Sequence, residues 1–307
     1  RLEEMAPLLP AAARPLAGAI DGRATVETTA RGVSIALVAK GEKLAVGPDY
    51  AFATLAVDGT AFVAAPLLPP RLDAIAVDAL AFAATDARTP AGPVASARGH
   101  LAGNAASHTL SLDATTEQGR IEGRLAGALA MATGRFGWRG RVESLAVRDA
   151  GGIAPLALAA PVAIDVAANR VSVGPAKFDS GSAQLEIDKL EWNDGALATR
   201  GRFRGLPTAP LVRRAGLESG WRSDLTLGGA WDVTSAPDWR GTIRIAREGG
   251  DVYVDDPGSE RTSRIALGFE TLVVDARLDG PRLTGTAELR AKLAGNTLVD
   301  FAVNAPA

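Results

Sequence analysis

The stretch that decides the fold of this chain lies between two glycine-containing segments: GRFGWRGRVESLAV at residues 134–147 and LEWNDGALATRGRFRGLP at residues 190–207. From one to the other, the sequence reads as short strands, each with a mostly apolar side, separated by Gly, Pro, Asn and Asp. The dipeptide Asp194-Gly195 is typical of a tight hairpin turn between antiparallel strands. These strands contain no set of catalytic residues, so the stretch predicts a surface rather than an active site.

The same two-residue period continues on both sides of this stretch. The segment LTGTAELRAKL, residues 283–293, places Leu, Gly and Ala on one side and Thr, Glu, Arg and Lys on the other. In residues 120–127, RIEGRLAG, one side is charged and the other carries nothing polar. Near Asp78 the alternation of apolar residues along the strand shifts by one position, which predicts a β-bulge.

We therefore expect an all-β fold with one or two short helices, and the family resemblance given below implies its form, an elongated, curled sheet, antiparallel or mixed, with a hydrophobic groove. The Ala- and Leu-rich segment 1–18, interrupted by prolines, predicts a short helical segment. A first groove section is expected at 19–205 and a second at 218–307. Between them, residues 206–217 predict a short helix, with Pro210 in its first turn and Gly216 at its end. The sections are expected to form one continuous rod.

Composition excludes several classes of function. The 33 Lys and Arg residues nearly balance the 35 Asp and Glu residues, so no basic field favours nucleic acid as a partner. Cysteine is absent, which removes disulfides, thiolate metal sites and cysteine nucleophiles but leaves the redox compartment open. No window holds the roughly 20 apolar residues that a membrane-spanning helix requires.

The sequence also gives no indication of enzymatic chemistry. The two histidines, His100 and His108, lie eight positions apart without a third metal ligand or a catalytic partner nearby. The acidic pair at 255–256 precedes Pro257-Gly258 and is interpreted as a turn. Serine-hydrolase, nucleotide-binding and zinc-protease motifs are absent. We expect no enzyme activity, no cofactor and no metal site.

The apolar side of so many strands must be hidden from water by a second layer, by closure of the sheet, or by a ligand. Aromatic residues make up only 5% of the chain, and a lining of Ala, Val, Leu and Ile suits flexible acyl chains. A packed core would show the same pattern, so both interpretations remain open for each residue. The candidate groove-lining residues are Val33, Ile35, Leu37, Ile121, Leu125, Leu185, Ile187, Leu225, Leu227, Ile243, Ile245, Leu283, Leu289, Val299 and Phe301.

The chain from about residue 95 to residue 300 resembles the middle of the TamB family, within the AsmA-like group of bridge-like lipid transfer proteins. Each matching residue is unspecific alone, and their order carries the resemblance. They are Gly99 to Leu101, His108, Leu110, Gly127, Trp138, Gly140, Leu145, Pro161, Leu190, Trp192, Gly195, Gly201 to Pro207, Leu225, Leu227, Gly229, Trp231, Gly241 and Arg247 to Asp251.

This resemblance implies a periplasmic rod along whose hydrophobic groove glycerophospholipids move between the inner and outer membranes of Gram-negative bacteria. It also implies an inner-membrane anchor in the full-length protein and a TamA-like outer-membrane protein as a partner. The family's anchor and its C-terminal domain have no counterpart in these residues, so partner docking is not transferred to any of them.

Two alternatives from other classes stay open. One is a scaffold that offers sheet edges to outer-membrane proteins or autotransporters during their assembly. The other is a closed two-layer sandwich with a purely structural role. The tryptophans, two of which lie in Trp-Arg-Gly triplets at 138–140 and 239–241, are expected to anchor a core or a groove edge rather than to stack on a sugar or a base.

Overall fold

The computed structural model describes residues 16–47, 49–65, 74–89, 92–132, 135–149, 155–167, 169–210, 221–255, 264–293 and 296–304. Within these ranges the chain is almost entirely β-strand, and every strand pairing described below is antiparallel. The all-β prediction is confirmed. The chain divides into two compact units, residues 1–150 and 151–307, and the predicted 206–217 segment falls inside the second unit.

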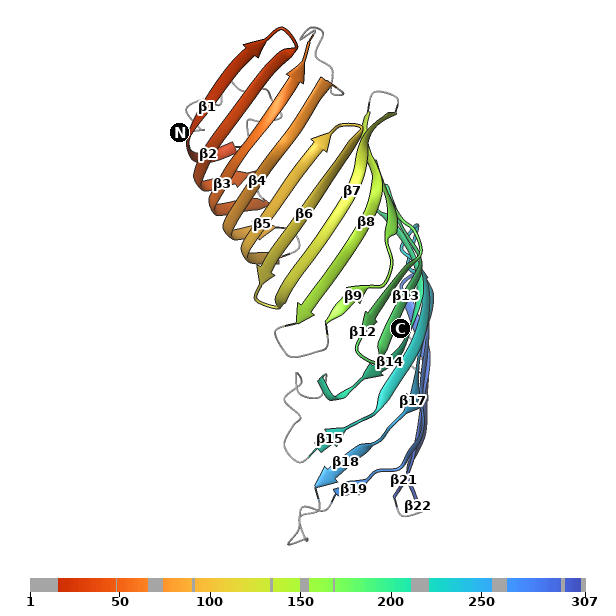
Figure 1. Ribbon diagram of the computed structural model, residues 1–307. Helices are drawn as coiled ribbons and strands as arrows, with labels where there is room; N and C mark the ends of the chain where they lie inside the picture. The colour runs from red at the N-terminus through yellow and green to blue at the C-terminus, as the bar shows by residue number, and fades with distance from the viewer. Residues whose placement is uncertain are drawn as a thin grey trace. The chain divides into compact units, whose positions relative to one another are not determined.

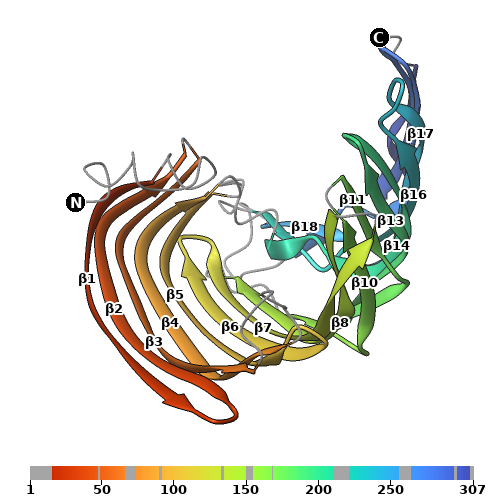
Figure 2. The same ribbon diagram turned by 90° about the horizontal axis from the view of Figure 1, so that it is seen from above.

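The first unit is a meander in which each strand pairs with the next along the chain (Figure 1). Most of its strands are 13 to 15 residues long and visibly bent, so the sheet is curved (Figure 2). Its strands are β1 (Leu16–Thr29), β2 (Gly32–Val46), β3 (Tyr50–Ala64), β4 (Ile75–Thr89), β5 (Gly92–Asn104), β6 (Ser107–Thr116), β7 (Gly119–Ala132) and β8 (Arg135–Asp149).

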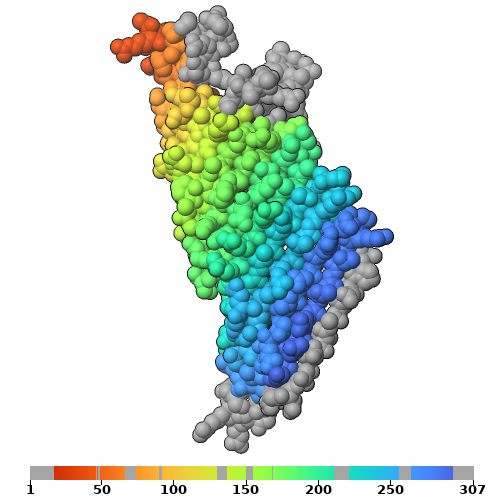
Figure 3. Space-filling model, turned by 90° about the vertical axis from the view of Figure 1, so that its right-hand side faces the viewer, coloured from red at the N-terminus to blue at the C-terminus, as the bar shows by residue number. Residues whose placement is uncertain are grey.

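The second unit continues the same principle with shorter strands. Its main sheet runs β10-β11-β13-β14-β16-β17-β20-β21-β22, with β12 on β13 and β9 on β12, and β15-β18-β19 form a small separate sheet. In Figure 3 the green, cyan and blue bands of this unit follow one another in chain order. Its strands are β9 (Leu156–Leu158), β10 (Val162–Ala167), β11 (Arg170–Val173), β12 (Ala176–Ser180), β13 (Ala183–Asn193), β14 (Ala196–Pro207), β15 (Trp221–Ser223), β16 (Thr226–Thr234), β17 (Arg240–Gly249), β18 (Val252–Asp255), β19 (Arg264–Ala266), β20 (Phe269–Asp279), β21 (Arg282–Leu293) and β22 (Asn296–Asn304).

Local sequence signals explain the turns. Asp194 and Gly195 both have positive φ, 48° and 85°, between the paired residues Asn193 and Ala196, as expected of the predicted two-residue hairpin. A second device was not anticipated: a Thr-x-x-Gly turn, seen at 29–32, 89–92 and 116–119. In each, the threonine hydroxyl donates a hydrogen bond to the glycine carbonyl, at 2.9 to 3.2 Å. The same hydrogen bond thus recurs at three hairpins of the first unit, β1–β2, β4–β5 and β6–β7.

The bulge predicted near Asp78 is confirmed. Val77 pairs with Gly103 and the next paired residue, Leu80, pairs with Leu101, so Asp78 and Ala79 stand outside the regular register. Because of the extra residue, Val77 and Leu80 project from the same side of the sheet although their spacing is odd. The bulge therefore keeps the apolar side continuous across β4.

The structure describes only parts of the two predicted helices, and strand occupies some of those parts. Residues 16–18 of the predicted segment 1–18 belong to β1, and residues 1–15 lie outside the described ranges. Residues 206–207 of the predicted helix 206–217 end β14, where Leu206 pairs with Leu227. Residues 209–210 are helical, and 211–217 lie outside the described ranges. Pro207 is tolerated because it stands at the end of a strand.

Each sheet is a single layer in the part of the chain that the structure describes. All extensive contacts between strands join hydrogen-bonded neighbours, and side chains such as Leu37, Val274 and Leu283 remain 37% to 47% exposed. Among the described residues no large side chain is fully buried, and the ten buried hydrophobic residues include six alanines. The closed sandwich expected as one alternative is therefore not what these residues form.

Candidate functional site

The first unit carries a continuous aliphatic face, defined here as the side of β1–β8 that bears Leu37, Leu110 and Leu125. Residues that pair directly across strands share a face, so each row of partners can be followed through the sheet. Three successive rows contain only Gly, Ala, Val, Leu, Ile and Phe from β1 to β8. One such row is Ala24, Leu37, Gly59, Leu80, Leu101, Leu110, Leu125 and Val142.

The second unit carries an aliphatic face of its own, built in the same way. Two of its central rows are entirely apolar from β12 to β21. A third central row is apolar except for a single hydroxyl group, that of Thr199. Two of the rows are Phe178, Leu185, Phe203, Gly229, Ile245, Val274 and Ala287, and Ala176, Ile187, Gly201, Trp231, Ile243, Ala276 and Gly285.

The opposite side of each sheet, here called the ion-paired face, holds most of the charged residues. In the first unit Arg124 pairs with Glu143 at 2.9 Å, and in the second Arg244 contacts Asp275 at 3.1 Å. These ion pairs join neighbouring strands and are largely exposed, so each adds little stability. They do fix the register, because a shift by one residue would turn the charges onto the aliphatic face.

Most of the predicted groove-lining residues fall on these two aliphatic faces by register. In the first unit these are Val33, Ile35, Leu37, Ile121 and Leu125, which lie on β2 and β7. In the second they are Leu185, Ile187, Leu227, Ile243, Ile245, Leu283 and Leu289. The structure thus groups them in two sets, one per unit.

The remaining three predicted residues are Leu225, Val299 and Phe301. Leu225 precedes β16 and is buried, with 6% of its surface exposed, and its backbone carbonyl accepts a hydrogen bond from Thr208. It contributes to local packing rather than to an open surface. Val299 and Phe301 lie on β22, where they pair with Ala291 and Leu289.

Aromatic rings lie over glycines on both aliphatic faces. The ring of Phe82 covers Gly99, and that of Trp138 covers Gly127 and Gly140. In the second unit Phe203 covers Gly229 and Trp231 covers Gly201. Each ring fills the space that the missing side chain leaves, which keeps the face smooth and protects the backbone beneath. Sequence reasoning noted these aromatic residues but did not pair them with glycines.

Replacing Gly229 by alanine should destabilise the protein by about 1–3 kcal/mol, because the added methyl group overpacks the site. Its Cβ would lie 2.6 Å from Cε1 of Phe203 and 2.5 Å from the carbonyl oxygen of Arg244. Gly123→Ala is the matched control, since its Cβ would meet nothing closer than 3.7 Å. Urea denaturation compares the two; equal losses of unfolding free energy would contradict the ring-over-glycine interpretation.

The polar residue His108 lies on the aliphatic face of the first unit, in the row next to the three apolar rows. His108 pairs with Gly127, and its Nε2 accepts a hydrogen bond of 2.7 Å from Nε1 of Trp138, across the intervening strand. Its Nδ1 lies 3.0 Å from the carbonyl oxygen of Asn104, so this nitrogen carries the proton and the ring is neutral. Beside it lies an apolar hollow of about 270 Å³, lined in part by Val77, Leu101 and Leu129.

A larger hollow, of about 830 Å³, crosses β1–β5 on the ion-paired face of the first unit. Its walls carry Asp21, Arg23, Lys40, Asp58 and Arg98 above a floor of alanine and glycine. Long charged side chains around short ones produce this depression, and its mixed charge is unsuited to an acyl chain. His100 lies on the same face and is exposed.

The second unit contains the most enclosed carboxylate of the described residues. Glu186 pairs with Lys177 on one side and Arg202 on the other, and only 12% of its side chain is exposed. The hydrogen bond from Arg202 is the main reason that the pKa of Glu186 is lowered, with a smaller contribution from Lys177. Three strands, β12, β13 and β14, are thereby joined through one carboxylate.

Glu186 should stabilise the fold in a pH-dependent way. Because its pKa is lower in the folded chain than the usual value of about 4.3, its contribution is complete above that value and is lost as the pH falls further. Glu186→Gln should therefore be less stable than the parent near neutral pH, and the gap in stability should narrow as the pH falls below the usual glutamate pKa of about 4.3. Denaturation midpoints measure this, with the exposed Glu191→Gln as control; a gap that persists in acid refutes it.

The described residues contain no group of three or more His, Asp or Glu side chains placed to hold a metal ion. Within the same ranges we find no helix with both the length and the apolar character required to cross a bilayer. Comparison of the chain with protein-family models, with curated proteins and with solved structures found no match.

Proposed function

We propose that the two aliphatic faces bind the acyl chains of glycerophospholipids. On this proposal the chain is a segment of a TamB-like, bridge-like lipid transfer protein that acts in the periplasm between the inner and outer membranes. It performs no chemistry on the lipid. The sheet supplies an apolar surface, and the headgroups stay in water.

The observation that carries the proposal is the uncovered state of each aliphatic face. Rows of aliphatic residues run across whole sheets, yet the described residues place no second layer on them. Transfer of apolar surface from water to an apolar partner is favourable by about 25 cal/mol per Å², so such a face favours an apolar ligand. The surface is also monotonous, which suits movement along it because no single position holds a chain strongly.

The energetics favour a long hydrocarbon ligand over a small one. Each buried CH₂ contributes about 0.8 kcal/mol, so two chains of about 16 carbons would lose on the order of 20 kcal/mol or more on entering water. An extended aliphatic face removes most of this barrier along its length. The 270 Å³ hollow beside His108 is smaller than the roughly 300–1,000 Å³ of a pocket for a drug-sized ligand.

Photocrosslinking residues at Leu227 and Leu289 test the proposal. Both positions lie on the aliphatic face of the second unit. Phospholipid adducts at both positions are expected when the protein is expressed in its own envelope. Adducts formed only with outer-membrane proteins, or no adducts at all, would contradict it.

A second candidate is supported by a different observation. β1 pairs with β2 alone among the described residues, which leaves the other edge of this 14-residue strand without a partner. An open edge is a template for an added strand, as an assembly scaffold for outer-membrane proteins would require. Crosslinking from Thr25 on this edge separates the two: adducts with a client protein there, without lipid adducts at Leu289, favour the scaffold.

A further inference from the structure

The ion-paired face of β5–β8 is unusually rich in arginine. Among the side chains that the structure describes, this face carries by register six arginines and three carboxylates, Asp113, Glu122 and Glu143, which leaves three positive charges in excess. The other two carboxylates of residues 92–149 are Glu117, in a turn, and Asp149, which pairs with Gly119 at the end of the sheet. We call the six arginines the arginine patch: Arg98, Arg120, Arg124, Arg139, Arg141 and Arg148.

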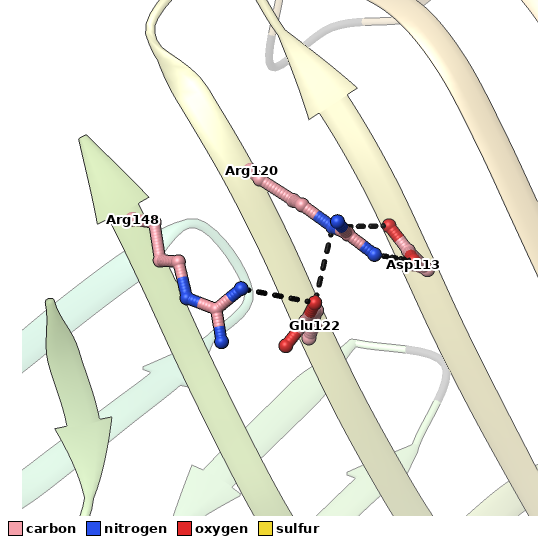
Figure 4. Close-up of polar contacts among 4 residues, drawn as sticks. All are labelled: Asp113, Arg120, Glu122 and Arg148. Atoms are coloured by element: carbon pink, nitrogen blue, oxygen red, sulfur yellow. Dashed lines mark hydrogen bonds and ion pairs between the residues drawn. The ribbon is translucent and has the colours of Figure 1, made fainter. Parts of the chain in front are cut away.

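The carboxylates hold these guanidinium groups in place. Glu122 lies between Arg120, at 3.0 Å, and Arg148, at 3.4 Å, while Arg120 also pairs with Asp113 (Figure 4). Glu143 is likewise shared, at 2.9 Å from Arg124 and 3.0 Å from Arg141. The hydrogen bond from Arg120 lowers the pKa of Asp113, so this network stays ionised at neutral pH. The guanidinium groups are therefore oriented before any partner arrives.

The patch remains accessible. The side chains of Arg120, Arg124, Arg141 and Arg148 are 48% to 61% exposed, although each already contacts a carboxylate. A guanidinium group has five donors, so one carboxylate leaves donors free for a second anion. Arginine also binds phosphate in a bidentate manner, which lysine does not do, and the patch contains no lysine.

We propose that the arginine patch docks the first unit on the surface of a bilayer that contains anionic phospholipids. A broad sheet face with charges spread over four strands matches a surface of repeated phosphates better than it matches a single small molecule. Among the described residues this face of β5–β8 has no Phe, Tyr or Trp on which a base could stack, which disfavours single-stranded nucleic acid. The inference concerns the opposite face from the acyl-chain proposal and does not depend on it.

Vesicle flotation tests the inference with the whole chain. Binding to vesicles of phosphatidylcholine and phosphatidylglycerol is expected, with little binding to phosphatidylcholine alone and release at about 0.5 M salt. Replacing Arg124, Arg141 and Arg148 together with glutamine should weaken binding by about tenfold or more. The matched control replaces Arg200, Arg244 and Arg277, which lie on the ion-paired face of the second unit, and should leave binding unchanged.

A second variant, which makes the patch more positive instead of less, keeps the test decisive if the triple variant folds poorly. Glu122→Gln with Glu143→Gln removes two negative charges from the patch, so binding to anionic vesicles should become several-fold tighter. Equal binding to neutral vesicles, comparable binding to duplex DNA, or weaker binding of the glutamine pair would overturn the inference. Labelling of the aliphatic face by acyl chains, measured in the same variants, shows separately whether the acyl-chain proposal holds.

Discussion

Leu125→Asp is expected to reduce acyl-chain binding by the first unit by about 60- to 300-fold. Leu125 lies in the middle of β7 between Leu110 and Val142, at the centre of an all-apolar row. A carboxylate placed among hydrocarbon costs about 2.5–3.5 kcal/mol on membrane-insertion scales, and 1.4 kcal/mol corresponds to a factor of ten. Fluorescence of a bound acyl-chain reporter measures the loss.

The adjacent residue provides the control for this prediction. Ala126 lies on the ion-paired face, opposite Arg141, so Ala126→Asp adds the same charge one position away without touching the aliphatic face. We expect this variant to bind acyl chains as the parent does. If both variants lose binding equally, then the two faces of β7 do not differ in function; circular dichroism verifies that each variant is folded.

Trp138→Ala is expected to lower the free energy of unfolding by about 2–4 kcal/mol. The change uncovers Gly127 and Gly140 and leaves Nε2 of His108 without its donor. Trp138→Phe keeps a ring over the glycines and loses only the indole N–H, so it should cost about 1 kcal/mol. Urea denaturation of both variants separates the ring from the hydrogen bond.

Trp239→Ala serves as the comparison, because that side chain is 51% exposed and lies outside the strands. We expect a change of no more than about 0.5 kcal/mol there. Similar losses for Trp138→Ala and Trp239→Ala would show that the ring over the glycines has no special role.

Period-two patterns made much of the fold predictable. The segment 283–293 alternates as predicted and forms most of β21, and the turn at 194–195 and the bulge near Asp78 follow from local residue types. Strand lengths were underestimated: Tyr50–Ala64 is one strand although it contains Gly59. Leu80 packs over that glycine, and this compensation comes from a neighbouring strand that local sequence does not reveal.

The candidate site was predictable in part for the same reason. Alternation assigns Leu37, Ile121 and Ile245 to an apolar side, and the pairing register confirms that assignment. Leu225 fits the alternation equally well but is buried before its strand begins, because Thr208 folds back on its carbonyl. The ring-over-glycine contacts and the link between His108 and Trp138 join residues up to 30 positions apart, a distance at which no spacing rule operates.

The most direct test of the central claim is to map where a phospholipid with a photoreactive acyl chain labels β7. The account predicts adducts at Ile121, Gly123 and Leu125 and none at Arg120, Glu122 or Arg124, so that labelling follows a period of two. Labelling of both sets, or labelling of neither, would contradict the claim that the aliphatic face is covered by acyl chains.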